Sequence, residues 1–127
     1  YISDCLQSVK NQTYNNIEHI VIDGGSTDGT KEIIESFNKN IAFYISEKDT
    51  GLYNALNKGI KKATGDIVGI LHSDDVFYES ETIQKVVNAF KISPKETFLG
   101  PPPNCSIRLN PNFQPLMGSI LTWVPSK

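Results

Sequence analysis

The sequence predicts an α/β fold, in which a mainly parallel β-sheet is covered by helices on both faces. Two observations support this prediction: short runs of β-branched residues alternate with stretches of helical periodicity over residues 1–93, and polar, glycine-containing loops follow several of the apolar runs. Such alternation is typical of parallel sheets, because a crossover, usually a helix, must connect each strand to the next. The chain has 127 residues, 39% hydrophobic and 20% charged, which is enough for one core.

Apolar spacing assigns the elements in chain order. The opening stretch YISDCLQSVKNQTY places apolar side chains at i, i+3, i+4 and i+7, the spacing of one helical face. The next run, IEHIVI, is rich in β-branched residues and too short for a helix, so we expect a strand. A helical stripe follows in TKEIIESF, with Ser, Thr and Asp upstream as sources of N-cap oxygens.

The second half continues the alternation. IAFYI predicts a short strand, and the stretch after it repeats apolar residues at helical spacing until Gly65 ends the pattern. DIVGIL predicts a third strand, and a last helical stripe ends before Pro94. The expected helices cover residues 1–14, 30–37, 52–63 and 83–90, and the expected strands cover residues 17–22, 41–45 and 66–71.

The ends of the chain depart from this pattern. A parallel sheet normally begins with a strand, whereas this chain begins with a helix, so we expect the first strand of the sheet to be missing. Residues 1–99 form the α/β portion, with a further strand expected near Thr97. Residues 100–127 hold six of the seven prolines without a clear period, which predicts irregular backbone of unassigned function. An incomplete sheet exposes an unpaired edge, through which a homodimer is one expected outcome.

Composition excludes several classes of function. Twelve Lys and Arg against fourteen Asp and Glu give a net charge of -2, so no broad basic surface attracts nucleic acid. Cys5 and Cys105 lie in unrelated contexts without metal-ligand spacing, and we expect both to be reduced thiols. No apolar run approaches the roughly 20 residues that span a bilayer, and no signal peptide is recognisable. These features predict a cytoplasmic protein.

The loop IDGGSTDGT is the first candidate site, because ligands of open α/β sheets bind beyond the carboxyl ends of the strands. Gly24, Gly25 and Gly29 allow the backbone to approach a ligand closely, while Asp23 and Asp28 supply acceptors. The loop matches neither GxxxxGK[ST] nor GxGxxG. A turn followed by a helix cap is the equally weighted alternative.

The stretch HSDD is the second candidate site. Mg or Mn prefers oxygen ligands, and one or two carboxylates together with substrate phosphates complete its coordination. Asp74 and Asp75 at a strand end suit that requirement, and their mutual repulsion favours a cation. The alternative is that Ser73 or Asp74 only caps a turn.

The stretch SEKDTGLYNALNKG is the third candidate. Glu47 and Asp49 precede a helix, where acids favour the positive end of the dipole, and this capping role accounts for both. Asn57 and Lys58 fit an apolar helix face poorly, so they point either toward a ligand or toward water. His72 is a further candidate, although a lone histidine is more often structural.

Taken in order, SVKNQTYNNIEHIVIDGGSTDGT and SEKDTGLYNALNKGIKKATGDIVGILHSDD resemble the family-two nucleotide-sugar glycosyltransferases of the GT-A fold, of the bacterial cell-surface polysaccharide type. The resemblance covers residues 1–93 and implies a Rossmann-like, N-terminal donor-binding portion. It implies that the loop of Asp23, Gly24 and Ser26 lies against the nucleotide. It also implies that Asp49 and the region of Asn57 line the donor pocket.

The same resemblance implies a metal site at the acidic motif. Asp74 matches the closing acid of the DxD pattern and is the first choice as ligand of Mg or Mn, in contact with the donor diphosphate. Asp75 is the second choice, as metal ligand or ribose-side contact. Two positions depart from the family pattern: Gly24 stands where many relatives have Asp, and His72 stands where Asp or Asn is common. No general base is assigned in this chain.

The implied activity is transfer of a sugar, with inversion, from a UDP- or GDP-type donor to a hydroxyl of a glycan or lipid-linked acceptor, in polysaccharide or cell-envelope biosynthesis. The full-length protein is then expected in the cytoplasm, with peripheral association at the inner face of the membrane as a further expectation. Two alternatives stay open. One is a non-catalytic nucleotide-binding remnant, and the other is a receiver-like signalling domain with Asp23 as phosphoacceptor.

Overall fold

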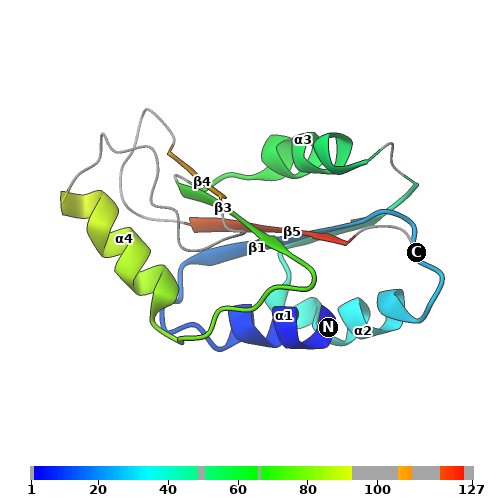
Figure 1. The fold of residues 1–127 in the computed structure, drawn as a ribbon, viewed down its shortest axis with the longest axis horizontal. Coiled ribbons are helices and arrows are strands. Elements are labelled where there is room, and N and C mark those ends of the chain that lie inside the picture. The colour runs from blue at the N-terminus through cyan, green and yellow to red at the C-terminus, as the bar shows by residue number, and fades with distance from the viewer. Residues whose placement is uncertain (1, 49–50, 66, 93–105, 110–117, 125–127) are drawn as a thin grey trace.

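The computed structural model describes residues 2–48, 51–65, 67–92, 106–109 and 118–124 (Figure 1). The helices in these ranges are α1 (Ile2–Lys10), α2 (Thr30–Ser36), the 3-10 turn η1 (Asn38–Asn40), α3 (Leu52–Lys62) and α4 (Thr82–Ile92). The strands are β1 (Ile17–Asp23), β2 (Phe43–Ser46), β3 (Ile67–His72), β4 (Ser106–Leu109) and β5 (Gly118–Val124). None of the helices in the described ranges is long and apolar enough to cross a membrane.

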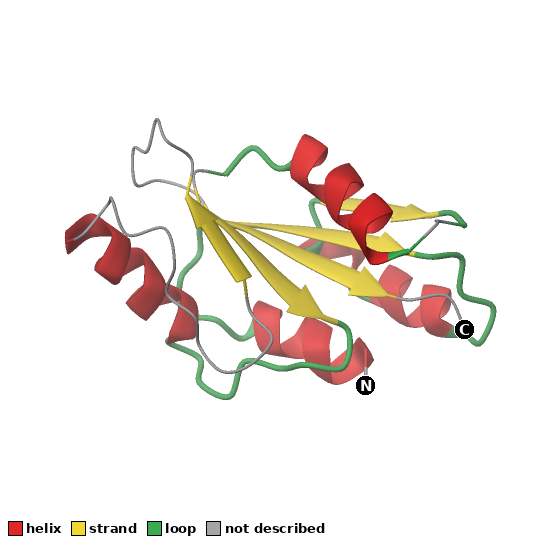
Figure 2. Ribbon diagram, turned by 45° about the horizontal axis from the view of Figure 1, so that its top comes forward, coloured by secondary structure: helices red, strands yellow, loops and turns green. Residues whose placement is uncertain are grey.

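The strands form one sheet in the order β2-β1-β5-β3-β4. The strands β2, β1, β5 and β3 are parallel, and β4 pairs with β3 in the antiparallel direction (Figure 2). Helix α3 covers one face of the sheet, while α1, α2 and α4 lie on the other side (Figure 1). The prediction of an α/β fold with a mainly parallel sheet and helices on both faces is confirmed.

Alternation along the strands divides the core between these two layers. The even-numbered side chains of β1 pack under α3, and Val68 and Ile70 of β3 join them there. The odd-numbered side chains of the same strands face the opposite layer, where Val21 meets α1 and α2 and Leu71 meets α1 and α4. Burial on both faces explains why these strands read as continuous apolar runs in the sequence.

The expectation of irregular backbone after Gly100 was wrong for two segments. Strands β4 and β5 both fall in that region. Each lies between prolines, so the prolines bound the strands and do not interrupt them. The strand expected near Thr97 falls outside the described residues.

The right-handed connections between parallel strands explain why a strand position is present next to β1, where β5 lies. Helices α1 and α2 contribute to one cluster on the same face as Val21. Because crossovers between parallel strands are right-handed, a strand preceding α1 would pair with β1 on the side away from β2. That is where β5 lies, paired with β1 and β3 along their lengths. The homodimer was expected through an unpaired edge of the sheet. No such edge is present beside β1, because β5 pairs there, and the outer strands of the described sheet are β2 and β4.

His19 is a buried titratable group on the face shared with Val21. His19 is 3% exposed, and burial lowers its pKa from 6.5 to about 4. The unfolded chain therefore binds this proton more readily than the folded chain between these two values. The stability that His19 contributes is fully present above pH 6.5 and is lost as the pH falls toward 4.

We expect the free energy of unfolding to fall by about 1.4 kcal/mol per pH unit from this group between pH 6 and pH 5. Urea denaturation at several pH values measures the slope. His19→Gln should flatten it, at the cost of a lower stability at pH 7. His72→Gln removes the other histidine and should retain most of the slope. An unchanged slope in His19→Gln would show that other groups carry the acid sensitivity.

Candidate functional site

The carboxyl ends of β1, β2 and β3 meet at one edge of the sheet because these strands run in one direction (Figure 2). They end at Asp23, Ser46 and His72. Strand β5 ends at the same edge, since its residue Val124 pairs with Asp23 in the Cα register. The loops predicted to carry the chemistry therefore start side by side.

Asp23 is fully buried and organises the first of these loops. Its Oδ1 accepts a hydrogen bond from Ser26 Oγ at 2.6 Å. Its Oδ2 accepts from the backbone N–H of Ser26 at 3.0 Å and from Ser46 Oγ at 2.6 Å. One carboxylate thus fixes the turn after β1 and joins it to the end of β2. The structure brings the predicted Asp23 and Ser26 together, and the contact of either with a nucleotide stays a prediction.

Gly25 shows why this loop needs glycine. Its φ is +89°, in the left-handed region, and a Cβ built on it would lie 3.3 Å from the backbone nitrogen of Lys48. Gly29 has almost the same φ, +88°, but a Cβ there would meet nothing within 4 Å. Gly24 beside them is buried. The loop after β1 is therefore packed against the chain that follows β2.

This pair of glycines gives a matched test. Gly29→Ala carries only the cost of a left-handed alanine, about 1 kcal/mol. Gly25→Ala carries that cost and also pushes against the Lys48 backbone, so we expect it to destabilise the fold by about 2–3 kcal/mol in total. Chemical denaturation of both variants measures the difference. Equal losses would show that the contact with Lys48 is not tight in solution.

The cap of α2 differs in detail from the prediction. The N-cap residue is Gly29, which has no side chain to cap with. Asp28 instead supplies the oxygen, because its Oδ1 accepts from the backbone N–H of Thr30 at 3.3 Å and from Thr30 Oγ1 at 2.5 Å. The interpretation as a turn followed by a helix cap therefore holds for the second half of this loop.

The acidic loop, residues 73–81, begins with a tight turn in which the backbone N–H of Asp75 donates to the carbonyl of His72 at 3.0 Å. Asp74 is exposed at this turn, whereas Asp75 is half-buried and its Oδ2 is removed from solvent. In the described part of the chain no group of three or more His, Cys, Asp or Glu is placed to hold a metal ion. The residues fit a cation only where a phosphate-bearing ligand completes the coordination, and Asp74 is the more accessible ligand.

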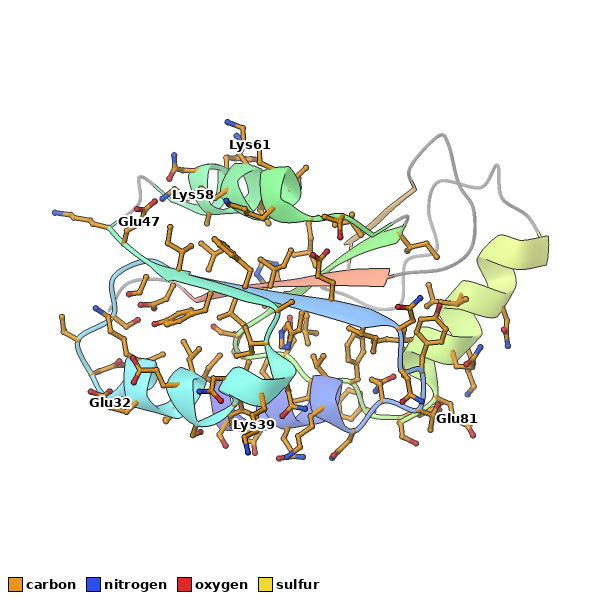
Figure 3. All side chains as sticks on the ribbon, turned by 180° about the vertical axis from the view of Figure 1, so that it is seen from behind. Glu32, Lys39, Glu47, Lys58, Lys61 and Glu81 are labelled. Carbon is orange, nitrogen blue, oxygen red and sulfur yellow. The ribbon has the colours of Figure 1, made fainter. Side chains whose placement is uncertain are left out.

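The third loop is only partly described, because Asp49 lies outside the described residues. Asn57 is exposed on α3. Lys58 Nζ lies 2.6 Å from Glu47 Oε1, so this ion pair ties α3 to the end of β2 (Figure 3). The side chains are 25% and 48% exposed, and such a pair contributes well under 1 kcal/mol. The pair gives Glu47 and Lys58 partners that sequence reasoning did not assign.

Sequence reasoning missed two further polar residues, one at this edge of the sheet and one at the far end of the acidic loop. Ser46 has no motif around it, and its role follows only from its Cα register with Asp23 across the β1–β2 pair. Gln12 reads as a solvent-facing residue after a helix, yet it is 7% exposed and contacts the end of the acidic loop. Both contacts join segments far apart in the sequence, which local patterns do not reveal.

A parallel sheet with a glycine-rich loop and an acidic loop at its carboxyl edge is the arrangement of ligand-binding α/β proteins. This chain belongs to glycosyl transferase family 2, whose family model matches residues 1–124. The predicted family is thereby confirmed. The family membership leaves the alternative of a signalling domain without support.

Two curated relatives show the extent of the similarity. The chain is 41% identical over 85 residues to an uncharacterized glycosyltransferase of Mycobacterium tuberculosis, covering 66% of this chain and 32% of that protein. It is 38% identical over 85 residues to a PGL/p-HBAD biosynthesis glycosyltransferase of Mycobacterium bovis, covering 65% and 33%. The chain thus spans about a third of the length of these relatives. No solved structure matches it.

Proposed function

We propose that this chain forms the donor-binding part of an inverting glycosyltransferase that uses a UDP- or GDP-type sugar donor. The observation that carries the proposal is the exposure of Asp74 at the carboxyl edge, beside the loop that Asp23 and Ser26 fix. The acceptor is a hydroxyl of a glycan or lipid-linked glycan. A relative named for PGL/p-HBAD biosynthesis supports a role in glycan biosynthesis.

The proposed donor site divides its work between two loops. A bound Mg or Mn would act as a Lewis acid toward the leaving diphosphate, and Asp74, with Asp75 as second choice, would hold it. The backbone of Gly24, which has no side chain, would let the nucleotide approach closely, while the missing side chain of Gly25 makes room for the backbone of Lys48. Asp23 would act through the loop, because its oxygens are already engaged by Ser26 and Ser46.

The acceptor hydroxyl must lose a proton as it attacks the anomeric carbon, which calls for a general base. Glu79 is the nearest carboxylate after the metal motif in sequence, but it pairs with Lys85, 2.5 Å away, and its backbone carbonyl contacts Gln12. These contacts place Glu79 near the C-terminal end of α1 and the start of α4, away from Asp74. We therefore assign no general base among the described residues.

The proposed location is the cytoplasm, with peripheral association of the full-length protein at the inner face of the membrane. Both parts follow from the type of glycosyltransferase that the motifs resemble.

The proposal is tested by thermal denaturation of the chain with UDP, GDP, CDP or dTDP, each with and without Mn. A ligand that binds only the folded state adds about 2.7 kcal/mol at 100 times its Kd. We expect a stabilisation that needs both Mn and one nucleotide. The competing function is a non-catalytic remnant, which His72 in the first position of the motif favours. No stabilisation by any pair would support a non-catalytic module in which the fold survives and metal and donor binding are lost.

A further inference from the structure

Helix α1 and the residues just after it present three side chains to the backbone of the acidic loop. Cys5 and Ser8 are three residues apart on one face of α1, and Gln12 follows two residues after the helix ends at Lys10. We call these three side chains the α1 brace. Its contacts follow the chain from the end of β3 to the start of α4, and the segment between β3 and α4 runs along α1 (Figure 1).

The first two members of the brace enclose the acidic pair. The Cys5 thiol donates to the carbonyl of His72, with Sγ and O 3.4 Å apart. Ser8 Oγ accepts from the backbone N–H of Phe77 at 3.2 Å. Ser8 Oγ itself donates to the carbonyl of Cys5 at 2.7 Å, which leaves its acceptor side for Phe77. Asp74 and Asp75 therefore lie between two backbone groups that α1 holds.

Gln12 fixes the far end of the loop with both ends of its amide. Its Nε2 donates to the carbonyl of Glu79 at 2.8 Å, and its Oε1 accepts from the backbone N–H of Ile83 at 3.0 Å. That N–H belongs to the first turn of α4, where backbone donors have no partner within the helix. Gln12 is 7% exposed, so water does not readily replace it. It therefore acts as an N-cap for α4 supplied from the segment that follows α1.

Apolar packing supports the same arrangement. Phe77, in the middle of the loop, packs against the cluster that contains Cys5 and Val9 of α1. Ile83, whose N–H Gln12 accepts, belongs to that cluster as well. The backbone N–H of Thr13, just beyond the helix, adds a bond to the carbonyl of Ser80 at 2.8 Å. Residues 72–83 thus contact α1 at their start and centre, and the segment just after α1 at their far end.

We propose that the α1 brace positions the acidic loop, so that Ser8 and Gln12 set the place of Asp74 at the carboxyl edge without touching a ligand themselves. The part of the inference that concerns donor binding rests on the proposed function. Asp74 is exposed, and its own side chain gives the turn little packing. Its position consequently depends on the backbone contacts on either side of it.

The test uses the whole chain and two measurements. Backbone amide exchange by NMR reports whether the loop is held, at Phe77 and Ile83, with Val21 of the central sheet as internal reference. Ser8→Ala and Gln12→Leu should each raise exchange at the amide that they release by about tenfold, the value of one lost hydrogen bond, and leave Val21 unchanged. The second measurement is Mn-dependent affinity for the four nucleoside diphosphates named above.

Matched variants separate positioning from general damage. Gln7 lies on the same helix and donates a hydrogen bond of 2.8 Å to Asn11 on the exposed side, so Gln7→Ala should change neither exchange nor affinity. Ser8→Ala should weaken Mn-dependent nucleotide binding about three- to tenfold, and Ser8→Thr, which keeps the hydroxyl, should restore it. Gln12→Glu keeps the acceptor for Ile83 and should retain protection there.

Each outcome decides a different point. Unchanged exchange at Phe77 in Ser8→Ala, or at Ile83 in Gln12→Leu, would overturn the brace. Faster exchange with unaltered nucleotide affinity would overturn the positioning role and leave a structural one. If the unaltered chain binds no nucleotide with Mn, the proposed function fails, and the exchange measurement still decides whether α1 holds the loop.

Discussion

Asp23→Ala is expected to lower the free energy of unfolding by about 3–4 kcal/mol, whereas Asp23→Asn should lower it by about 1 kcal/mol. The carboxylate is fully buried and accepts three hydrogen bonds. Alanine leaves two buried donors of Ser26 and the hydroxyl of Ser46 without their acceptor. A buried donor that loses its partner costs about 1–3 kcal/mol. The loss is large beside the total stability of about 5–15 kcal/mol that small domains have.

Asparagine is the matched control because it preserves the shape of the group. Its amide oxygen can take the place of Oδ2 and accept from Ser26 N–H and from Ser46 Oγ, as Asp23 does. Its NH2 group can then donate to Ser26 Oγ, since a hydroxyl both donates and accepts. The network survives with only the charge removed. Urea denaturation of the two variants measures the gap between them, and comparable losses in both would show that the charge, not the hydrogen bonding, stabilises this turn.

The local elements were predictable because their signals lie within the elements. The strand expected over residues 17–22 is Ile17–Asp23, and the helix expected over 52–63 is Leu52–Lys62. Their apolar periods reflect the layers that bury them. Strand β5, GSILTWV, is rich in β-branched and aromatic residues, but its place in the sheet depends on pairing with β1 and β3, far away in the chain. Its seven residues lie between prolines, so the sequence there was interpreted as irregular backbone and not as a strand.

The candidate site divides in the same way. Asp23, Ser26 and Asp74 were found because they belong to short motifs at strand ends. Ser46 and Gln12 were missed because each acts through a contact between distant segments. A serine at the end of a strand and a glutamine after a helix are both ordinary at exposed positions. Only the register of β1 with β2, and the path of the acidic loop along α1, give these residues their roles.

Asp74→Asn is expected to abolish the stabilisation by Mn and nucleotide while leaving the free chain almost unchanged. Asp74 is exposed, and exposed substitutions usually change stability by less than about 0.5 kcal/mol. An amide oxygen is a weaker ligand for Mg or Mn than a carboxylate, because it carries no charge to offset that of the cation. The ligand-dependent increment of about 2.7 kcal/mol at 100 times Kd should therefore disappear.

Glu81→Gln provides the control for charge alone. Glu81 is also exposed and follows the same strand, but it lies at the end of the molecule opposite Glu47 and Lys58 (Figure 3). The Glu81→Gln substitution removes the same unit of charge as Asp74→Asn without altering the carboxyl edge. If Mn and nucleotide act at that edge, the Glu81 variant keeps the full thermal shift and the Asp74 variant loses it. Equal partial losses in both would instead mean that the cation is held by the diffuse field of the acidic chain, and Asp74 would cease to be the metal ligand.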